Sequence, residues 1–334
     1  MLPPLILSAS AAMCHAWYAD GLHQRKPNEV DCIKNLIQSA LPIVQALWLP
    51  LLQQIGLQTT LRGVVCHGQP QVSFPAASKA CELGDLLLVH DHMPSRAPPQ
   101  RRAVIVQAKM FGSSGVNSKN AIQLHLYQQW PRFKYTKWPG GMRSLDSIHA
   151  AAGLTATLPL RLERELSITG VPGGPPASSF MLDAGCRYGM IDEAYIRWQY
   201  GRMIRNPWRM CSAQVKNVYS SKAGFTFEIY LALLLAGLVG RHAPQTQWPV
   251  NLGVACHWSL MVMELLSILP GPVLPGAIGL PSASDNVSFL AATPNLGLNT
   301  YRSVKSPPTG RDVEDEGAFG IIHIKTAGDL DDVT

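Results

Sequence analysis

The stretch VIVQAKM, residues 104–110, carries polar side chains where a buried strand would be apolar. Gln107 and Lys109 are two residues apart, so on a strand they point to the same side of the sheet. A lysine rarely lies in a core without a partner. Asp85 stands immediately before an earlier apolar run, Leu86–Val89. If the two strands are neighbours, a carboxylate, an amide oxygen and a cation meet at one place.

This combination of side chains is suited to a hard divalent cation. Mg²⁺ takes oxygen ligands and retains several waters. A bound metal lowers the pKa of one of these waters and holds a phosphate. A lysine alongside orients that water or neutralises developing charge. Asp85, Gln107 and Lys109 are therefore expected to suit a metal site that holds a phosphate beside an activated water.

Helices are predicted on both sides of these residues in the chain. The segment 28–56 is typical of a helix capped by Asn28, with Pro42 and Pro50 kinking or dividing it. The segment 118–130 is typical of an amphipathic helix, because its apolar residues recur at helical spacing. These helices would cover the strands that carry the polar residues.

Strands are predicted between and after the helices, at 57–68, 82–90, 103–109, 178–185 and 318–327. A Pro-rich loop, 91–102, joins the second strand to the third and favours an antiparallel pair. That pairing would bring Asp85 opposite the Gln107 end of its neighbour.

The order of these elements resembles the PD-(D/E)xK nuclease superfamily, which has a restriction-endonuclease-like fold. In that family a helix bearing an acid precedes a strand bearing Asp and a strand bearing (D/E)xK. The matching residues here are Glu29, Asp85, Gln107 and Lys109, in the QxK variant of Mrr-like enzymes. The next helix carries Gln123 and Tyr127, similar to the Q-x-x-x-Y motif of RecB-type nucleases. The resemblance covers about residues 28 to 130.

The resemblance implies a role for each matching residue. Asp85, Gln107 and Glu29 would bind Mg²⁺ or Mn²⁺, and Lys109 would position the attacking water. Gln123 and Tyr127 would steady the site or contact the nucleic acid.

Two positions depart from the family pattern. Gly84 stands where the family has a proline, and Gln107 replaces an acid, which removes one negative ligand. The acidic ligand is assigned to Glu29 by its order in the chain. Asp31, Glu82 and Asp91 are alternatives for that role.

The charge distribution predicts a polyanionic partner. The formal net charge is +6, and nine Lys or Arg residues accompany a single acid, Asp91, between His90 and Leu145. Within this part, the tract WPRFKYTKW mixes aromatic rings with cations. Such a tract suits phosphate contact and base stacking, or else an amphipathic surface loop. The predicted nucleic-acid contacts there are Arg132, Lys134 and Lys137.

The predicted fold is α/β, with a restriction-endonuclease-like mixed sheet flanked by helices. A nuclease-like domain is expected over 1–200 and an accessory, mostly helical region over 201–334. The apolar segments FEIYLALLLAGLVG and WSLMVMELLSILPGPVLPGAIGL are expected to be buried helices and no membrane contact is expected, because each carries a glutamate. These C-terminal helices would support a homo-oligomer or bind a partner protein.

The cysteines favour a reducing compartment. There are seven, spread singly and without a CxxC motif. A zinc site from Cys66, His67 and Cys81 is disfavoured by its spacing. The first residues lack the basic start of a signal peptide, so a cytoplasmic location is expected.

The function predicted from these features is a Mg²⁺-dependent nuclease acting on nucleic acid, with DNA favoured. By fold-level analogy it would serve restriction, phage defence or repair. One alternative is a nucleic-acid-binding module with an inactive nuclease fold, which the Gln107 substitution supports. Another is a scaffold protein whose apolar C-terminal helices bind a partner chain.

Overall fold

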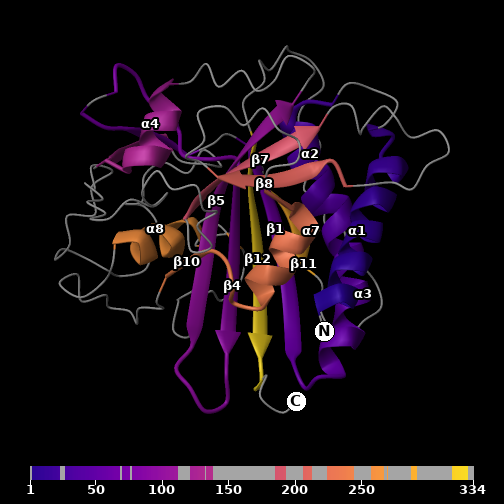
Figure 1. Cartoon of the computed structure of the whole chain (residues 1–334). Helices are drawn as coiled ribbons and strands as arrows, with labels where there is room; N and C mark the ends of the chain where they lie inside the picture. Colours follow the sequence, from indigo (N-terminus) through magenta and orange to yellow (C-terminus); the bar gives the residue numbers. More distant parts are fainter. Residues whose placement is uncertain are drawn as a thin grey trace.

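The computed structural model describes residues 2–22, 27–67, 70–75, 77–111, 121–131, 133–137, 185–192, 206–212, 224–243, 257–266, 269, 287–291 and 318–329. In these residues a mixed sheet of parallel and antiparallel strands has helices on both faces (Figure 1). The α/β class and the mixed sheet flanked by helices, both predicted from the sequence, are confirmed.

The main sheet has the order β11-β1-β12-β4-β5-β7-β8-β9, with β10 paired to β5. Its strands are β1 (Gln58–His67), β4 (Leu86–Met93), β5 (Gln100–Phe111), β7 (Cys186–Asp192), β8 (Trp208–Ser212), β9 (Phe225–Thr226), β10 (Arg241–His242), β11 (Val287–Ala291) and β12 (Ala318–Ala327). β4 and β5 are antiparallel, as predicted from the loop that joins them. β7 was not predicted, and the candidate strand 178–185 lies outside the described residues apart from Gly185.

β12 lies in the middle of the sheet, antiparallel to β1 and parallel to β4. Alternating apolar residues bury it on both faces, with Ile322 and Ile324 in one core and Phe319 and Ile321 in the other. Strands from both sides of residue 200 therefore lie in one sheet, and the domain division drawn there from the sequence runs through it. The described part of 201–334 contains five strands beside α7 and α8, so the prediction of a mostly helical C-terminal part is not supported.

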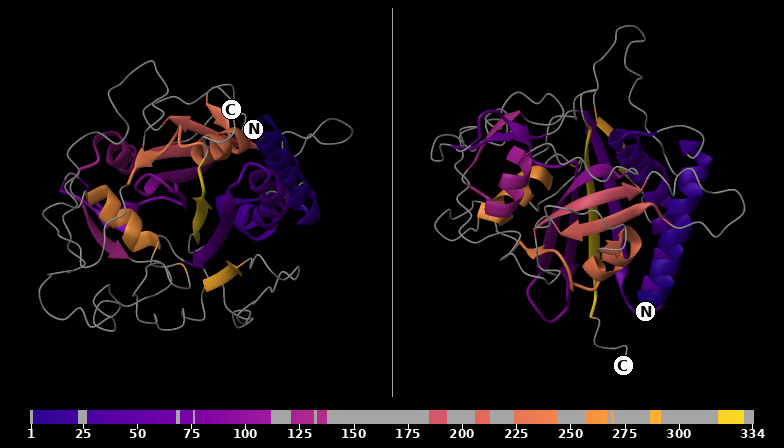
Figure 2. Two further views of the ribbon diagram at one scale, coloured as in Figure 1. Left: turned by 90° about the horizontal axis from the view of Figure 1, so that it is seen from below. Right: turned by 45° about the horizontal axis from the view of Figure 1, so that its top comes forward.

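One face of the sheet is covered by N-terminal helices and α7 (Figure 2). They are α1 (Leu2–Ala19), α2 (Glu29–Lys34), the π-helical η2 (Asn35–Ala40), α3 (Leu41–Gln53) and α7 (Phe227–Leu235). Asn28 caps α2 as predicted, because its side chain accepts from Asp31 N at 2.8 Å while the Asp31 carboxylate accepts from Asn28 N. The helical run changes from the π-helical η2 to the α-helical α3 just before Pro42. Pro50 lies inside α3 and does not end it.

The run Glu29–Gln53 is one continuous helical stretch with a mean hydropathy of 1.3 over its most apolar window. Among the described residues it is the one helix long and apolar enough to cross a membrane, judged by length and composition. Half of that window is buried inside the protein, and the core helix of a soluble protein meets the same criteria.

The other face is covered by α4 (Ala121–Gln129), α8 (His257–Leu266) and a small sheet of β2 (Gln71–Ser73), β3 (Cys81–Glu82) and β6 (Lys134–Lys137). α4 confirms the predicted helix from Ala121 to Gln129, and residues 118–120 of the predicted range lie outside the described residues. The aromatic rings of the tract WPRFKYTKW that are described, Trp130, Phe133 and Tyr135, are all buried. Trp130 packs edge-on against Trp258, with ring centroids 5.8 Å apart. The expectation that these three rings stack on bases is wrong, because they belong to the core.

Candidate active site

Asp85 and Gln107 meet where β4 begins and β5 approaches its end. The register that pairs Leu86 with Val106 places Asp85 opposite Gln107. The Asp85 carboxylate accepts hydrogen bonds from the Gln107 side-chain amide and, at 2.7 Å, from the backbone N of Ala108. The structure thus brings together the two residues that the sequence placed on neighbouring strands.

Gly84 makes this close approach possible. A Cβ atom at Gly84 would overlap Cγ2 of Ile105 and would lie 3.3 Å from the Tyr127 hydroxyl. Both neighbours are fully buried, so neither can move without disturbing the core. The packing therefore explains why glycine occupies the position before Asp85.

Two side chains of α4 hold Gln107 from the other side. The Gln123 amide donates to the Gln107 carbonyl oxygen and, at 3.1 Å, to the backbone carbonyl of Glu82. The Tyr127 hydroxyl donates to the Leu83 carbonyl at 2.8 Å and lies 3.3 Å from the Gln107 oxygen. Gln123 and Tyr127 are both buried, so their geometry suits support of the site and not direct contact with nucleic acid.

Glu29 reaches the same place from α2, far away in the sequence. One oxygen of Glu29 accepts from the backbone N of Met110, 3.3 Å away, beside Lys109 on β5. Glu29 and Glu82 each act electrostatically on Asp85, and so does Lys109. Asp85 is therefore within electrostatic range of two other carboxyl groups and one lysine.

Burial raises the pKa of the Asp85 carboxyl to about 8. The Lys109 cation opposes this shift, whereas the negative charges of Glu82 and Glu29 add to it. Burial also raises the pKa of Glu82, again opposed by Lys109. The charged forms of both carboxyl groups are thus disfavoured, and a cation bound near them would stabilise those forms.

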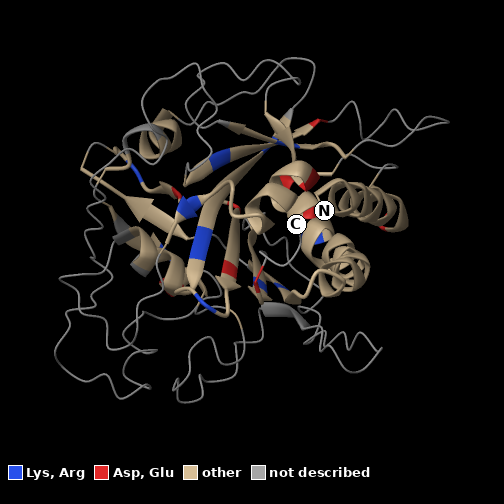
Figure 3. Ribbon diagram, turned by 60° about the horizontal axis from the view of Figure 1, so that its bottom comes forward, with Lys and Arg blue, Asp and Glu red and all other residues tan. Residues whose placement is uncertain are grey.

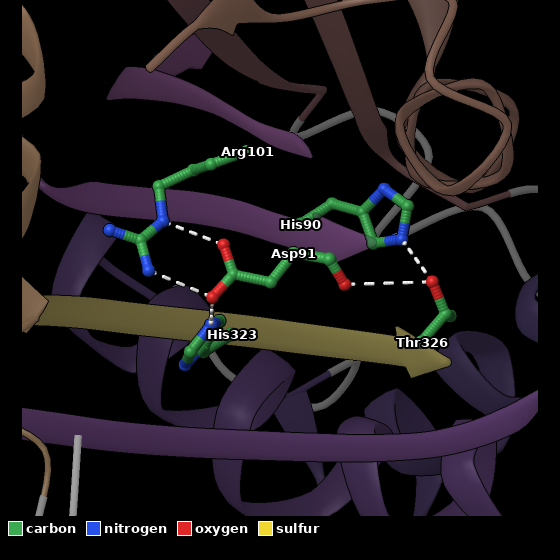
Figure 4. Close-up of polar contacts among 5 residues, drawn as sticks. All are labelled: His90, Asp91, Arg101, His323 and Thr326. Carbon is green, nitrogen blue, oxygen red and sulfur yellow. Dashed lines mark hydrogen bonds and ion pairs between the residues drawn. The ribbon is translucent and has the colours of Figure 1, made fainter. Parts of the chain in front are cut away.

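Two of the three alternatives for the acidic ligand lie elsewhere. Asp31 is engaged in the cap of α2. Asp91 lies at the opposite end of β4, where its carboxylate accepts two bonds from Arg101 and contacts His323 (Figure 4). Glu82 had been only an alternative to Glu29, yet both reach Asp85. The spacing of Glu82 three residues before Asp85 was the signal for it in the sequence.

The donor set fits a hard cation in its chemistry, since Asp85, Glu82 and Glu29 offer carboxylate oxygens. Within the described residues no three His, Cys, Asp or Glu side chains converge as a ready metal cluster. The Gln107 amide does not offer its oxygen to Asp85, because its nitrogen faces Asp85 and its oxygen faces α4. For Gln107 to offer its oxygen to a metal, that amide has to turn over.

The predicted nucleic-acid contacts are only partly described. Arg132 lies outside the described residues, and Lys134 lies in β6 without a described side chain. Lys137, at the end of β6, is exposed. The basic middle of the chain is not one patch, since Arg101 and Lys109 lie at opposite ends of β5.

Comparison with family models, with curated proteins and with solved structures gives no match for this chain. The comparisons therefore do not bear on the resemblance to the PD-(D/E)xK nucleases. The case for an active site depends on the geometry around Asp85.

Proposed function

We propose that the protein is a metal-dependent nuclease that hydrolyses phosphodiester bonds in nucleic acid, with DNA as the favoured substrate. The observation that carries the proposal is the convergence of Asp85, Gln107 and Lys109 with a glutamate from a distant helix. Four elements contribute to this point: α2, β3, the start of β4 and the end of β5. A lysine at a solvated strand end would not need these carboxyl and amide groups around it.

Each side chain has a proposed task. Asp85 and Glu29, with Glu82 beside them, would bind Mg²⁺ or Mn²⁺, and Gln107 would complete the ligand set or hold Asp85 in place. A bound metal would lower the pKa of a coordinated water and would hold the phosphate. Lys109 would orient that water and offset the charge that gathers in the transition state.

The supporting residues act one step further out. Gln123 and Tyr127 would fix the orientation of Gln107, since both lie against its carbonyl oxygen. Arg132, Lys134 and Lys137 would contact the phosphate backbone beyond the site. Burial of the site, with Asp85 only 3% exposed, would keep bulk water away from the reacting group.

A nucleic-acid-binding module without nuclease activity is the second candidate. The observation in its favour is that Gln107 is neutral and is engaged at both ends of its amide. Such a protein would keep the fold and the basic residues while binding no catalytic metal.

One experiment separates the two candidates. Purified protein is incubated with single-stranded and double-stranded DNA and with RNA, in Mg²⁺, Mn²⁺ or EDTA, beside Asp85→Asn as the matched control. A nuclease cleaves at least one substrate with metal, and neither EDTA nor Asp85→Asn permits cleavage. Salt-sensitive binding without cleavage in any metal selects the binding module. Cleavage by Asp85→Asn at the parental rate places the chemistry elsewhere.

A further inference from the structure

The far end of the main sheet carries a second group of charged side chains. On the sheet face that bears Asp85, the residue Asp91 lies six positions further along β4, about 20 Å away on an extended strand. The Arg101 guanidinium donates to both carboxylate oxygens of Asp91, at 2.6 and 2.8 Å (Figure 4). His323 Nε2 lies 3.0 Å from one of these oxygens. All three side chains are buried. The negative charge of Asp91 is thus stabilised by its contacts with Arg101 and His323.

Two further cations adjoin this buried group. Arg62 on β1 is opposite His323, and Lys325 on β12 is level with Asp91 on β4. Lys325 is opposite Thr60, two residues from Arg62, so both cations lie on the Asp91 face of the sheet. Figure 3 brings this end of the sheet forward and shows basic (blue) and acidic (red) positions on neighbouring strands. Both side chains are half-buried.

The described carboxylates at this end are engaged by other partners. Asp91 pairs with Arg101, and Asp329 accepts a hydrogen bond from the backbone N of Ser95. No described residue forms a hydrogen bond or ion pair with the side chain of Arg62 or Lys325. An anion bound between two such neighbouring cations would be stabilised by both charges.

Neighbouring charges act on Lys325. Burial is the largest cause that lowers the pKa of its ammonium group, and the charges of Arg62 and Arg101 lower it as well. The charge of Asp91 opposes this lowering. Arg62 and Lys325 are therefore near enough for each to feel the charge of the other.

We propose that Arg62 and Lys325 form a binding site for a phosphate group, separate from the candidate active site. A guanidinium binds phosphate oxygens in pairs, and an ammonium beside it adds a compact charge, so this pair matches phosphate in shape and in charge. The Asp91–Arg101 pair links β4 to β5 beside this site. The phosphate belongs either to a nucleic-acid backbone or to a small phosphorylated molecule. The site depends on no metal and stands whether or not the protein cleaves nucleic acid.

Pyrophosphate binding tests the site directly. Calorimetry in EDTA, at constant ionic strength, is carried out on the parent, on Arg62→Gln and Lys325→Gln, and on the double variant. Lys79→Gln serves as the control, because it removes the same charge from an exposed position in the loop before β3. We expect the double variant to bind roughly tenfold or more weakly, and Lys79→Gln to match the parent. Lys325→Arg, which keeps the charge, should retain binding.

The site is refuted if the parent shows no saturable binding, or if Lys79→Gln weakens binding as much as the double variant does. Melting temperatures without ligand check that each variant is folded. If the double variant is not folded, the comparison is made with the two single variants.

A second experiment identifies the source of the phosphate. An oligonucleotide that displaces pyrophosphate indicates a backbone phosphate, and an oligonucleotide that leaves it bound indicates a small phosphorylated molecule. Because EDTA is present throughout, failure here is distinct from failure of the metal site.

Discussion

At the scale of single residues, Asp85 decides between a metal site and an ordinary strand end. Asp85→Asn keeps the shape of the side chain and can still meet the backbone N of Ala108, but it removes the carboxylate that a metal needs. We expect metal-supported cleavage to disappear while the melting temperature in EDTA stays at or above that of the parent. Cleavage assays and thermal denaturation of the two proteins check this.

The pKa of Asp85 adds a pH dependence with a definite sign. Its carboxyl has an ordinary pKa of 3.8 and, when buried, a pKa of about 8. Between these values the folded protein holds a proton that the unfolded chain has lost, so its stability falls as the pH rises. The Asp85→Asn variant has no carboxyl group at this position, so it does not bind this proton in the folded state. In EDTA the stability of Asp85→Asn relative to the parent should therefore grow from about pH 4 to about pH 8, measured by urea denaturation. A difference that does not change with pH would show that Asp85 is ionised in the folded protein.

Lys109→Ala tests the charge on the transition state. We expect cleavage to fall by roughly a hundredfold or more, because the cation acts mainly as negative charge gathers on the reacting phosphate. Substrate affinity should fall far less, since other basic residues remain. The control is Lys79→Gln, which removes a cation from an exposed position outside the site. Unchanged cleavage in Lys109→Ala would remove the nuclease assignment for this strand.

Gln107→Glu gives a result that depends on metal. The substitution places a second carboxylate against Asp85 and removes the amide that donates to it. In EDTA we expect a lower melting temperature, because two buried acids compete for one position. Mg²⁺ should restore stability more in this variant than in the parent, since a carboxylate attracts the ion more strongly than an amide oxygen does. A loss of stability that Mg²⁺ does not reverse would indicate a purely structural Gln107.

At the scale of elements, the tight approach of β4 to β5 at Gly84 is the feature most sensitive to change. Gly84→Ala forces its new methyl group into Ile105 and toward the hydroxyl of Tyr127. We expect a loss of about 1–3 kcal/mol in the free energy of unfolding, together with displacement of Asp85. Denaturant titration measures the first and cleavage the second. Parental values in both would mean that the two strands separate more easily than their packing suggests.

The local elements were those that could be predicted from the sequence. The Asn28 cap, the antiparallel pair and the strand 318–327 depend on short-range signals such as capping residues, apolar periodicity and proline. The contact between Asp85 and Gln107 could be predicted from the antiparallel pairing of β4 with β5. Burial of Trp130 could not be predicted, because its partner Trp258 is far away in the sequence. The same holds for the approach of Glu29 to the site.

At the scale of the whole molecule, the sheet joins distant parts of the chain. β12 separates β1 from β4, so both of those strands need it as a neighbour. A chain shortened after residue 317 lacks β12, and a fragment of residues 1–200 also lacks β8 and β9. We expect neither to fold on its own. Circular dichroism and denaturant titration of the two fragments check this, and a cooperative transition in the 1–200 fragment would instead support a separate N-terminal domain.

The late position of β12 in the chain has a consequence during synthesis on the ribosome. β1 and β4 leave the ribosome long before β12, and until it arrives each presents an unpaired apolar edge. Pairing across such a large sequence separation is slow. The nascent chain is thus exposed to association with other copies of itself, and we expect its yield of folded protein in cells to depend on chaperones that shield strand edges.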